Sequence, residues 1–420
     1  MAAEIRSTGA YARLWRWHFY AAFLVIPFVL WQGTSGLVVL WSQEIGDALW
    51  PALRVVQPAE QPASLDAQRA AAQALAGSAV VRTIRVSADP RRSTEFLFDT
   101  LGGLPQPVYV DPGSGAALGA IPASHWLPGL TRKLHGGWPL GDPGSWLLEL
   151  GAGWALAMAL SGLYLWWPRG RKGLAGTLYP RLRGGTRVFW RDVHAVAGVW
   201  IAGLLVLFLL TALPWTAFWG EQILRPLQRA SGQTAPAALN PMLWSTTAAG
   251  PDLPLQRVVE IARAEGLAGT LEIQPRAHPL PVTVTERRGR ASEERVLQID
   301  RVSGQVRARV GWADYASVPR IVATGVDLHE GTFLGRANQW LNTALVLTLY
   351  WLAISGAIGW YRRRPAAGLG APPRSYAPLP ASVRAGAVGV CVLMPLLGLS
   401  VLLLAAFDAA WLAFRRSHPA

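Results

Sequence analysis

Cysteine is nearly absent from this chain, since Cys391 is the only one in 420 residues. A single thiol cannot form an internal disulfide, a cysteine-based zinc site or the ligand set of an iron–sulfur cluster. The Cys-x-x-Cys-His signature of covalently attached c-type haem is also missing. Any haem in this protein must therefore be held without a covalent bond to the chain.

Charged residues are scarce as well, at 15% of the chain, whereas hydrophobic residues make up 51% and tryptophan alone supplies 21. This composition is too apolar for an ordinary soluble enzyme and predicts a polytopic, mainly α-helical membrane protein. Much of the arginine behind the formal charge of +14 lies beside apolar runs, where it sets membrane topology. No nucleic-acid-binding motif accompanies the charge, so we expect no nucleic-acid partner.

One motif occurs twice with the same spacing. A histidine is followed by a tryptophan after 11 residues and by a Ser-Gly dipeptide after 26 residues in both copies. The members are His135, Trp146 and Ser161-Gly162 in the first copy, and His329, Trp340 and Ser355-Gly356 in the second. Agreement without a gap indicates an internal tandem duplication.

A second pair of histidines completes the repeat. His18 ends the segment Trp15-Arg-Trp-His and opens one apolar run, and His194 opens another after Arg191-Asp192-Val193. Each unit thus reads as a histidine-bearing helix, an extramembrane domain and a second histidine-bearing helix, and a further hydrophobic segment follows the second unit.

Five apolar runs are long enough to cross a bilayer, which takes about 20 residues. They are 19–41, 146–167, 193–219, 340–360 and 383–414, the last of which contains Pro395 and Asp408. A cleaved signal peptide fits the first run less well, because the run is long and no small-x-small site follows it closely. Seven basic residues between the second and third runs predict a cytoplasmic loop, and they are Arg169, Arg171, Lys172, Arg181, Arg183, Arg187 and Arg191.

These boundaries divide the chain as follows: 1–50, N-terminus and first span; 51–130, a small α+β domain; 131–192, second span and basic loop; 193–219, third span; 220–327, a second α+β domain; 328–364, fourth span; 365–420, linker and fifth span. In the first domain a helix at 64–76 precedes strands at 81–86, 94–99 and 107–111. In the second a helix at 254–265 precedes strands at 271–274, 282–287, 295–300 and 305–310. The turns Asp111–Gly115 and Asp300–Gly304 match. The basic loop leaves both domains on the opposite side of the membrane.

Four histidines at repeated places near the membrane boundary suggest two ligand pairs. A lone interfacial histidine would be explained by hydrogen bonds to lipid headgroups or backbone, but each pair here offers two neutral imidazoles to one metal. Zinc would need further ligands, and few carboxylates lie nearby, whereas haem iron needs only two axial ligands and an apolar pocket. Opposite faces of a bilayer are about 30 Å apart, so we predict that His18 pairs with His194 and His135 with His329, each pair binding one haem b.

The small residues in the spans have two possible roles. They could let a flat macrocycle approach the backbone, or they could allow close packing of helices. The glycines concerned are Gly33, Gly36, Gly151, Gly153, Gly162, Gly198, Gly203 and Gly356. The tryptophans are expected to be mainly interfacial anchors, and His125, His278 and His418 surface residues.

The motifs together resemble the PepSY-associated transmembrane family, whose bacterial members include ferric-siderophore reductases of the inner membrane. The likeness runs from Trp15-Arg-Trp-His18 through Ser161-Gly162-Leu163 to Ser355-Gly356. The two α+β domains are similar to PepSY modules. The resemblance implies His18, His135, His194 and His329 as haem ligands, large periplasmic domains, and electron transfer to an iron(III) chelate in the periplasm. One departure is that Thr211-Ala-Leu replaces the Thr34-Ser-Gly of the first span.

Three classes of function remain open at this stage. The first is a haem b reductase of ferric siderophores in the bacterial inner membrane, supplied with electrons from the cytoplasm or from quinol. The second is a non-enzymatic PepSY scaffold that binds or regulates periplasmic peptidases or other partners. A permease is the third, and the small number of charges within the spans argues against it.

Overall fold

The computed structural model describes residues 2–100, 104–169, 173–246 and 250–418, so Arg171 and Lys172 of the basic loop lie outside the described residues. The chain forms two compact units. The first, called the helical unit, comprises Met1–Thr34, Gly136–Leu224 and Trp340–Ala420. The second, called the sheet unit, comprises Ser35–His135 and Arg225–Gln339.

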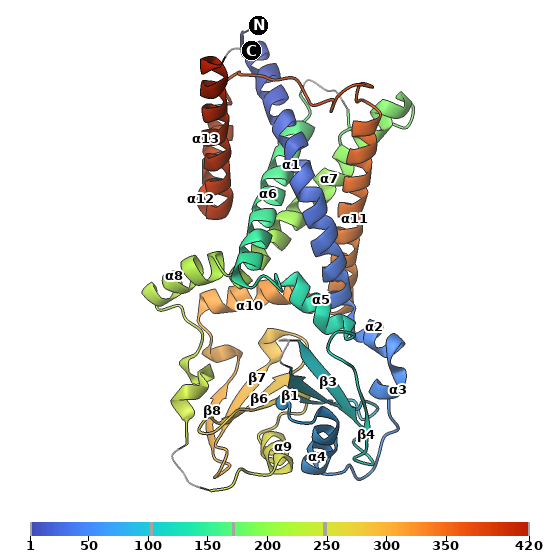
Figure 1. Cartoon of the computed structure of the whole chain (residues 1–420), viewed down its shortest axis with the longest axis vertical. Coiled ribbons are helices and arrows are strands. Elements are labelled where there is room, and N and C mark those ends of the chain that lie inside the picture. The colour runs from blue at the N-terminus through green and yellow to red at the C-terminus, as the bar shows by residue number, and fades with distance from the viewer. Residues whose placement is uncertain (1, 101–103, 170–172, 247–249, 419–420) are drawn as a thin grey trace. The chain divides into compact units, whose positions relative to one another are not determined.

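Long apolar helices make up the helical unit (Figure 1). Their bounds are α1 Ala2–Leu40, α6 Asp142–Trp166, α7 Gly185–Ala212, α11 Arg336–Tyr361, α12 Ala381–Leu393 and α13 Pro395–Ser417. Among the described residues, α1, α6, α7 and α11 are each long and apolar enough to cross a membrane. The predicted membrane protein with four spans ahead of its last segment is confirmed.

The predicted fifth span is broken into two helices. Between α12 and α13 the axis bends by 119° at Met394 and Pro395, because a proline restricts the residue before it to extended conformations. At about 1.5 Å per residue, α12 is roughly 20 Å long and too short for a hydrocarbon core of ~30 Å. The chain therefore turns back, and the end of α13 lies at the same end of the helical unit as the start of α1 (Figure 1).

Contacts to α6 and to the segment after α7 stabilise this hairpin. Met394 and Leu397 are buried in one cluster with Ala152 and Leu156 of α6. The carbonyl of Leu393, freed by the helix break, accepts a hydrogen bond from the Trp219 indole at 2.9 Å. The bend thus leaves its exposed backbone partly satisfied inside an apolar environment.

The third span also ends earlier than the predicted Trp219. α7 stops at Ala212, and Pro214 lies in a 3₁₀ turn, Leu213–Trp215, that is followed by a π-helical turn, Trp219–Leu224. Proline lacks the N–H that an α-helix needs in its interior, so the helix cannot continue regularly there.

One eight-stranded antiparallel sheet joins the two predicted α+β domains, with the order β4-β3-β2-β1-β5-β6-β7-β8. The strands are β1 Val80–Val86, β2 Thr94–Asp99, β3 Pro105–Val110, β4 Ala117–Ala120, β5 Thr270–Pro275, β6 Val282–Arg287, β7 Arg295–Ile299 and β8 Val306–Val310. The helices are α2 Ser42–Leu49, α3 Pro51–Arg54, α4 Leu65–Ala76, α5 Leu127–His135, α8 Arg225–Ala230, α9 Leu255–Ala264 and α10 Ser317–Glu330. The two domains are therefore halves of one unit and not separate bodies.

The halves meet where β1 pairs with β5. Ile84 lies opposite Ile273, and Arg85 lies opposite Glu272 in the register of the two strands. Arg85 also pairs with Glu95 of β2 at 2.6 Å, so its guanidinium bridges a carboxylate from each half. Backbone pairing and a shared charge thus hold the seam together.

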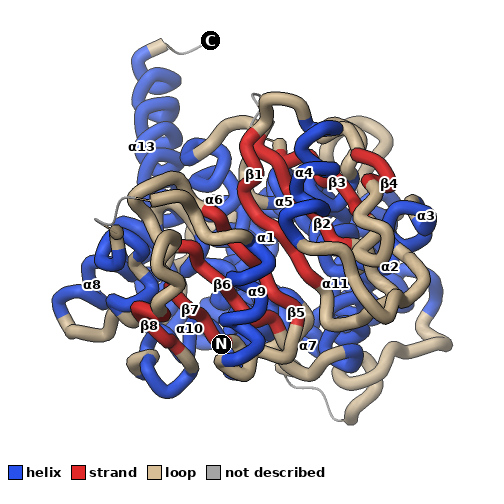
Figure 2. Tube along the Cα trace, turned by 90° about the horizontal axis from the view of Figure 1, so that it is seen from below, coloured by secondary structure: helices blue, strands red, loops and turns tan. Residues whose placement is uncertain are grey.

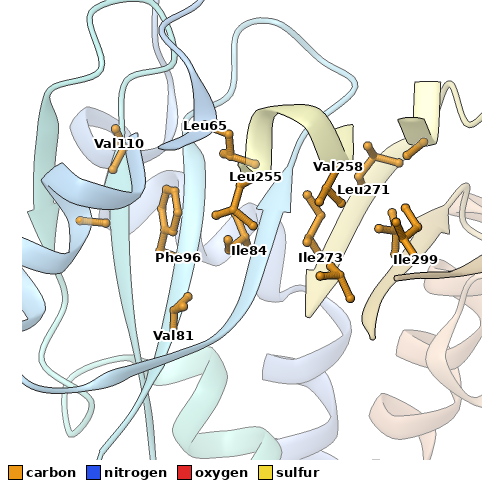
Figure 3. Close-up of a cluster of buried hydrophobic side chains, with 14 of the residues drawn as sticks. Leu65, Val81, Ile84, Phe96, Val110, Leu255, Val258, Leu271, Ile273 and Ile299 are labelled. Carbon is orange, nitrogen blue, oxygen red and sulfur yellow. The ribbon is translucent and has the colours of Figure 1, made fainter. Parts of the chain in front are cut away.

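Helices α4 and α9 cover the same face of the sheet (Figures 1 and 2). Between them and the strands lies one apolar core, to which both halves contribute, as with Phe96 and Ile273 (Figure 3). Asp66 of α4 accepts hydrogen bonds from the first backbone N–H groups of α9, at Leu255 and Gln256. A carboxylate at a helix N-terminus is stabilising, so each helix helps to position the other.

Each half of the sheet unit has the same order, a helix followed by four strands. In both matching turns the aspartate, Asp111 or Asp300, accepts hydrogen bonds from the backbone of the turn. Gly115 and Gly304 complete the turns at φ +73° and +74°, a conformation that favours glycine. This order is the one that a tandem duplication predicts. The short strand β4 and the helices α5 and α10 were not expected from the sequence pattern.

Candidate functional site

The four repeated histidines come together in two pairs, each within one unit. His18 of α1 and His194 of α7 form the helical pair, which belongs to the helical unit, and their rings lie close enough to interact electrostatically. His135, the last residue of α5, and His329, near the end of α10, form the sheet pair, which belongs to the sheet unit. The pairing is the one that the spacing of the sequence predicts.

Ring geometry in the sheet pair fits two ligands on one metal ion. The ring centroids of His135 and His329 are 6.5 Å apart and the ring planes are tilted by 59°. With metal–imidazole bonds of about 2 Å, two rings on opposite sides of one ion have centroids a little over ~6 Å apart. The separation is therefore close to the one expected for two imidazoles on a single metal ion.

In the helical pair, a serine fixes the proton on His18. The Ser161 hydroxyl donates to the carbonyl of Met158 at 3.0 Å, so its oxygen can accept from the Nδ1–H of His18, also at 3.0 Å. A proton on Nδ1 leaves the lone pair on Nε2 available. This hydrogen bond is the usual way in which proteins orient a histidine that ligates a metal.

His194 is held in the same way, with one acceptor more. Its Nδ1 lies 3.1 Å from the carbonyl oxygen of Leu352 and 3.1 Å from the Ser355 hydroxyl. Because a carbonyl only accepts, the proton must be on Nδ1. Both rings of the helical pair thus present an unprotonated Nε2.

His135 of the sheet pair contacts Ser35 of α1, whose hydroxyl lies 2.9 Å from Nδ1. Burial lowers the pKa of this imidazole to about 4, and the positive charge of Arg132 acts in the same direction. The ring is therefore neutral near pH 7, the form that binds a metal.

A glycine follows each of these three serines and lies against the histidine ring. A Cβ atom would lie 3.2 Å from His135 at Gly36, 3.3 Å from His18 at Gly162 and 3.2 Å from His194 at Gly356, in each case from the Cε1 atom. The Ser-Gly dipeptide is thus one structural element used three times: the serine binds the ring and the glycine makes room for it. We call it the Ser-Gly clamp.

Two other glycines follow the packing interpretation. A Cβ at Gly151 would lie 2.4 Å from the Phe28 ring, and one at Gly153 would lie 3.0 Å from Leu397. Close packing of helices therefore explains Gly151 and Gly153, and the approach of a macrocycle to the backbone stays a prediction.

His329 is positioned by the end of its own helix. Gly331 adopts the left-handed conformation that ends α10, at φ +79°. Asp327, one turn away, accepts hydrogen bonds from the Ala291 N–H and the Thr332 hydroxyl. In α7 the positions that match Ser35-Gly36 are Ala212 and Leu213, so this helix has no Ser-Gly clamp to offer.

The carboxylates near the pairs serve as partners of arginines. Glu330 pairs with Arg132 across α5 and α10 at 3.4 Å, and the nearly buried Asp192 pairs with Arg181 at 2.7 Å and with Arg191 at 2.9 Å. In the described part of the chain no three histidine, cysteine or carboxylate side chains converge as a metal site would require. The site therefore suits a cofactor whose metal needs only two protein ligands, as haem b does, and does not suit zinc.

One buried carboxyl group was not identified from the sequence. Glu149 of α6 is 1% exposed, and its Oε2 accepts a hydrogen bond from the Trp219 backbone at 2.9 Å. Glu149 thus adds a buried carboxyl group to the small number of ionisable groups within the spans. His125, His278 and His418 are exposed, as expected.

Membrane-crossing helices, an antiparallel sheet unit and two pairs of histidines define a polytopic membrane protein with a histidine pair in each of its two units. The chain belongs to the PepSY-associated transmembrane family, because the model of the PepSY-associated TM region matches residues 15–363. This match includes all four histidines of the two pairs. No curated protein sequence matches the chain closely enough to add to this assignment.

Proposed function

We propose that this protein is a haem b oxidoreductase of the bacterial inner membrane, which passes electrons across the membrane to ferric chelates such as siderophores in the periplasm. The observation that carries the proposal is the protonation of the ligands. In the helical pair both Nδ1 atoms face acceptors, which leaves both Nε2 atoms free for iron. In the sheet pair, the 6.5 Å separation of the rings fits a single iron.

Haem supplies reversible one-electron chemistry to such a protein. The histidines would hold each iron from both sides, the serines would keep the imidazoles in one orientation, and the apolar helices would exclude water and set the redox potential. No proton transfer by a side chain is needed, because reduction of Fe(III) to Fe(II) in the chelate takes one electron and weakens its binding.

The direction of transfer follows from topology. The basic loop joins α6 to α7, which supports a cytoplasmic position for the ends of these helices that contact the helical pair. In α6, Asp142 and Ser161 are separated by 19 residues, about 28 Å at 1.5 Å per residue, which is close to the thickness of the hydrocarbon core. The loop 136–141 links His135 to the start of α6, which supports a periplasmic position for the sheet pair.

Electrons would enter at the helical pair from a cytoplasmic donor or from quinol and leave at the sheet pair. Ferric chelates are large and hydrophilic, so they are expected to meet the protein at the sheet unit and not within the bilayer. This arrangement gives the sheet unit a role in bringing the chelate close to the sheet pair.

Two measurements on purified protein test the proposal. The visible spectrum should show a reducible b-type haem, and dithionite-reduced protein should be reoxidised by a ferric siderophore while a chromogenic chelator captures Fe(II). Colourless protein from cells with adequate haem would favour the scaffold function instead. Haems that stay reduced with every ferric chelate, but are reoxidised by a quinone, would leave a transmembrane cytochrome without iron reductase activity.

A further inference from the structure

Arg363 lies beside the helical pair without a carboxylate partner. It follows the end of α11 and is seven residues beyond Gly356, the glycine of the Ser-Gly clamp on His194. Its guanidinium carbon is 4.9 Å from the centre of the Trp15 ring and 5.1 Å from that of Phe19, on the turn of α1 that carries His18. The side chain therefore reaches from the end of α11, which carries the clamp on His194, to α1, which carries His18.

A second arginine approaches the same place from α7. Arg187 is seven residues before His194, which puts both on one face of the helix, about 10 Å apart along its axis at 1.5 Å per residue. Burial lowers the pKa of Arg363, and the positive charge of Arg187 lowers it further. Two cations are thus close enough to repel one another next to the helical pair.

Two other arginines near α7 are neutralised by a carboxylate. Arg181 and Arg191 both bind Asp192. Among the described side chains, no aspartate or glutamate forms an ion pair with Arg187 or Arg363, and the Arg363 guanidinium donates a hydrogen bond to the Gly370 carbonyl at 2.8 Å. Two unpaired cations in one place are stabilised by an anion between them, and guanidinium groups bind carboxylates with two parallel hydrogen bonds.

We propose that Arg187 and Arg363 bind the propionate carboxylates of the haem that His18 and His194 ligate. Haem b carries two propionates on one edge of its ring, which matches two guanidiniums in number and in charge. The axial distance of ~10 Å between Arg187 and His194 is comparable to the distance from a haem iron to its propionate oxygens. This inference rests on the proposed haem and adds the residues that fix its rotation about the axis through the two histidines.

The repeat supplies a matched control. Arg169 is seven residues beyond Gly162, as Arg363 is beyond Gly356. Its guanidinium, however, donates to the carbonyl of Tyr164 at 2.9 Å and lies 4.3 Å from the centre of the Tyr164 ring. Arg169 thus binds a carbonyl at the end of its own helix, and it also lies 5.7 Å from the centre of the Tyr11 ring. Its replacement controls for the loss of one positive charge at this end of the helices.

The test compares Arg363→Gln, Arg187→Gln, the double variant and Arg169→Gln, all in full-length protein in detergent. Each is assayed for haem content, for the rate at which apomyoglobin captures haem, and for midpoint potentials by spectroelectrochemistry. The double variant should release one haem at least about tenfold faster and shift the potential of the helical haem to lower values, because a positive charge that favours the reduced state is lost. Arg363→Lys, which keeps the charge, should retain the potential better than Arg363→Gln.

The haem at the sheet pair serves as the internal control for folding, since it should remain in every variant. Capture rates and potentials in the double variant equal to those of Arg169→Gln would overturn the proposal. So would loss of a bound anionic lipid from the double variant with unchanged haem, because a lipid headgroup would then be the anion. Wild-type protein without haem would instead contradict the proposed function itself.

Discussion

The helical pair and the sheet pair are held in different ways. Both rings of the helical pair lie on Ser-Gly clamps, at Ser161 and Ser355. In the sheet pair His135 lies on the clamp at Ser35, whereas His329 is positioned by the capped end of α10. The Ser-Gly clamp is therefore present at both rings of the helical pair, and in the sheet pair it is present at His135.

A metal ligand with a fixed Nδ1 partner keeps one orientation and one basicity. The Ser-Gly clamps fix three of the four rings in this way, and His329 takes its position from the end of α10. The following experiments, ordered from the largest expected effect to the smallest, test whether the two pairs are separate sites and how far they differ.

Removal of a ligand is expected to have the largest effect. His135→Ala or His329→Ala should remove the haem of the sheet pair and leave the other, and His18→Ala or His194→Ala should do the reverse, because each iron depends on one pair. A pyridine haemochrome assay measures the loss, and the potential of the remaining haem identifies the site. Loss of both haems from one substitution in folded protein would contradict the pairing.

Replacement of a clamp glycine by a bulkier residue is expected to have the second-largest effect. Gly162→Val and Gly356→Val should lose most of the haem of the helical pair, because even a Cβ would lie 3.3 Å and 3.2 Å from the imidazole Cε1 and the further methyl groups would displace the ring. Gly203→Val in α7 is the control, since its Cβ would meet nothing within 4 Å. Equal haem content in all three variants would show that the glycines serve another purpose.

Removal of the clamp hydroxyl should have a graded effect. Ser161→Ala takes away the acceptor for His18 and is expected to weaken haem binding by about tenfold, the lower end of the range for residues that orient metal ligands. Ser355→Ala should weaken haem binding less, because the Leu352 carbonyl still accepts a hydrogen bond from His194. Haem capture by apomyoglobin gives the rates, and Ser400→Ala, remote from either histidine, gives the baseline. A Ser355→Ala effect as large as that of Ser161→Ala would mean that the carbonyl contact does not hold the ring.

The smallest effect concerns the stability of the sheet unit. Burial raises the pKa of the Glu286 carboxyl, but the Gly269 N–H, Arg288 and Arg295 together lower it below the ordinary value. A lowered pKa in the folded state stabilises the fold above the unfolded pKa and loses that contribution as the pH falls through the folded one. Glu286→Gln should therefore reduce stability by about 2 kcal/mol at pH 7 and by less at pH 3. Thermal unfolding at the two pH values measures this, and a deficit that does not shrink in acid would contradict the role of the charge.

The periodicity of the sequence was sufficient to predict most of the helices and strands that occur in both halves. Strands β2 and β6 were predicted at their observed bounds, because β-branched and aromatic residues fill both of them. Strand β4 was missed, since Ala117–Ala120 has no β-branched or aromatic residue. The pairing of β1 with β5 was missed for another reason: a strand pattern does not specify its partner, and these two strands are far apart in the chain.

Local sequence also does not show whether a helix continues through a proline. Pro27 lies inside α1, which continues through it, whereas Pro395 marks a reversal of the chain. The difference comes from packing, because Met394 and Leu397 are buried against α6 and the Trp219 indole binds the carbonyl released at the break. No local pattern around either proline contains that information.

For the candidate site, the spacing gave all four histidines and their pairing, because the repeat and the thickness of a membrane constrain both. The role of the Ser-Gly dipeptides in holding the histidine rings could not be predicted from the sequence. Those dipeptides mark the repeat in the sequence, but only the crossing of the helices brings Ser161 to His18, 143 residues away. Glu149 was missed because its partner, the Trp219 backbone, lies beyond a break in α7 that the hydropathy pattern does not show.

The seam between β1 and β5 has a consequence for a chain that contained only one half of the sheet unit. In such a half, β1 would be an edge strand with a row of unpaired backbone N–H and C=O groups, the kind of surface that pairs with another molecule. In the present chain β5 occupies that position, and β4 and β8 form the two edges of the sheet. A single half would therefore expose an edge that can pair with a second copy of itself. In the present chain, where the two halves are covalently joined, that edge forms the central strand pair of the sheet.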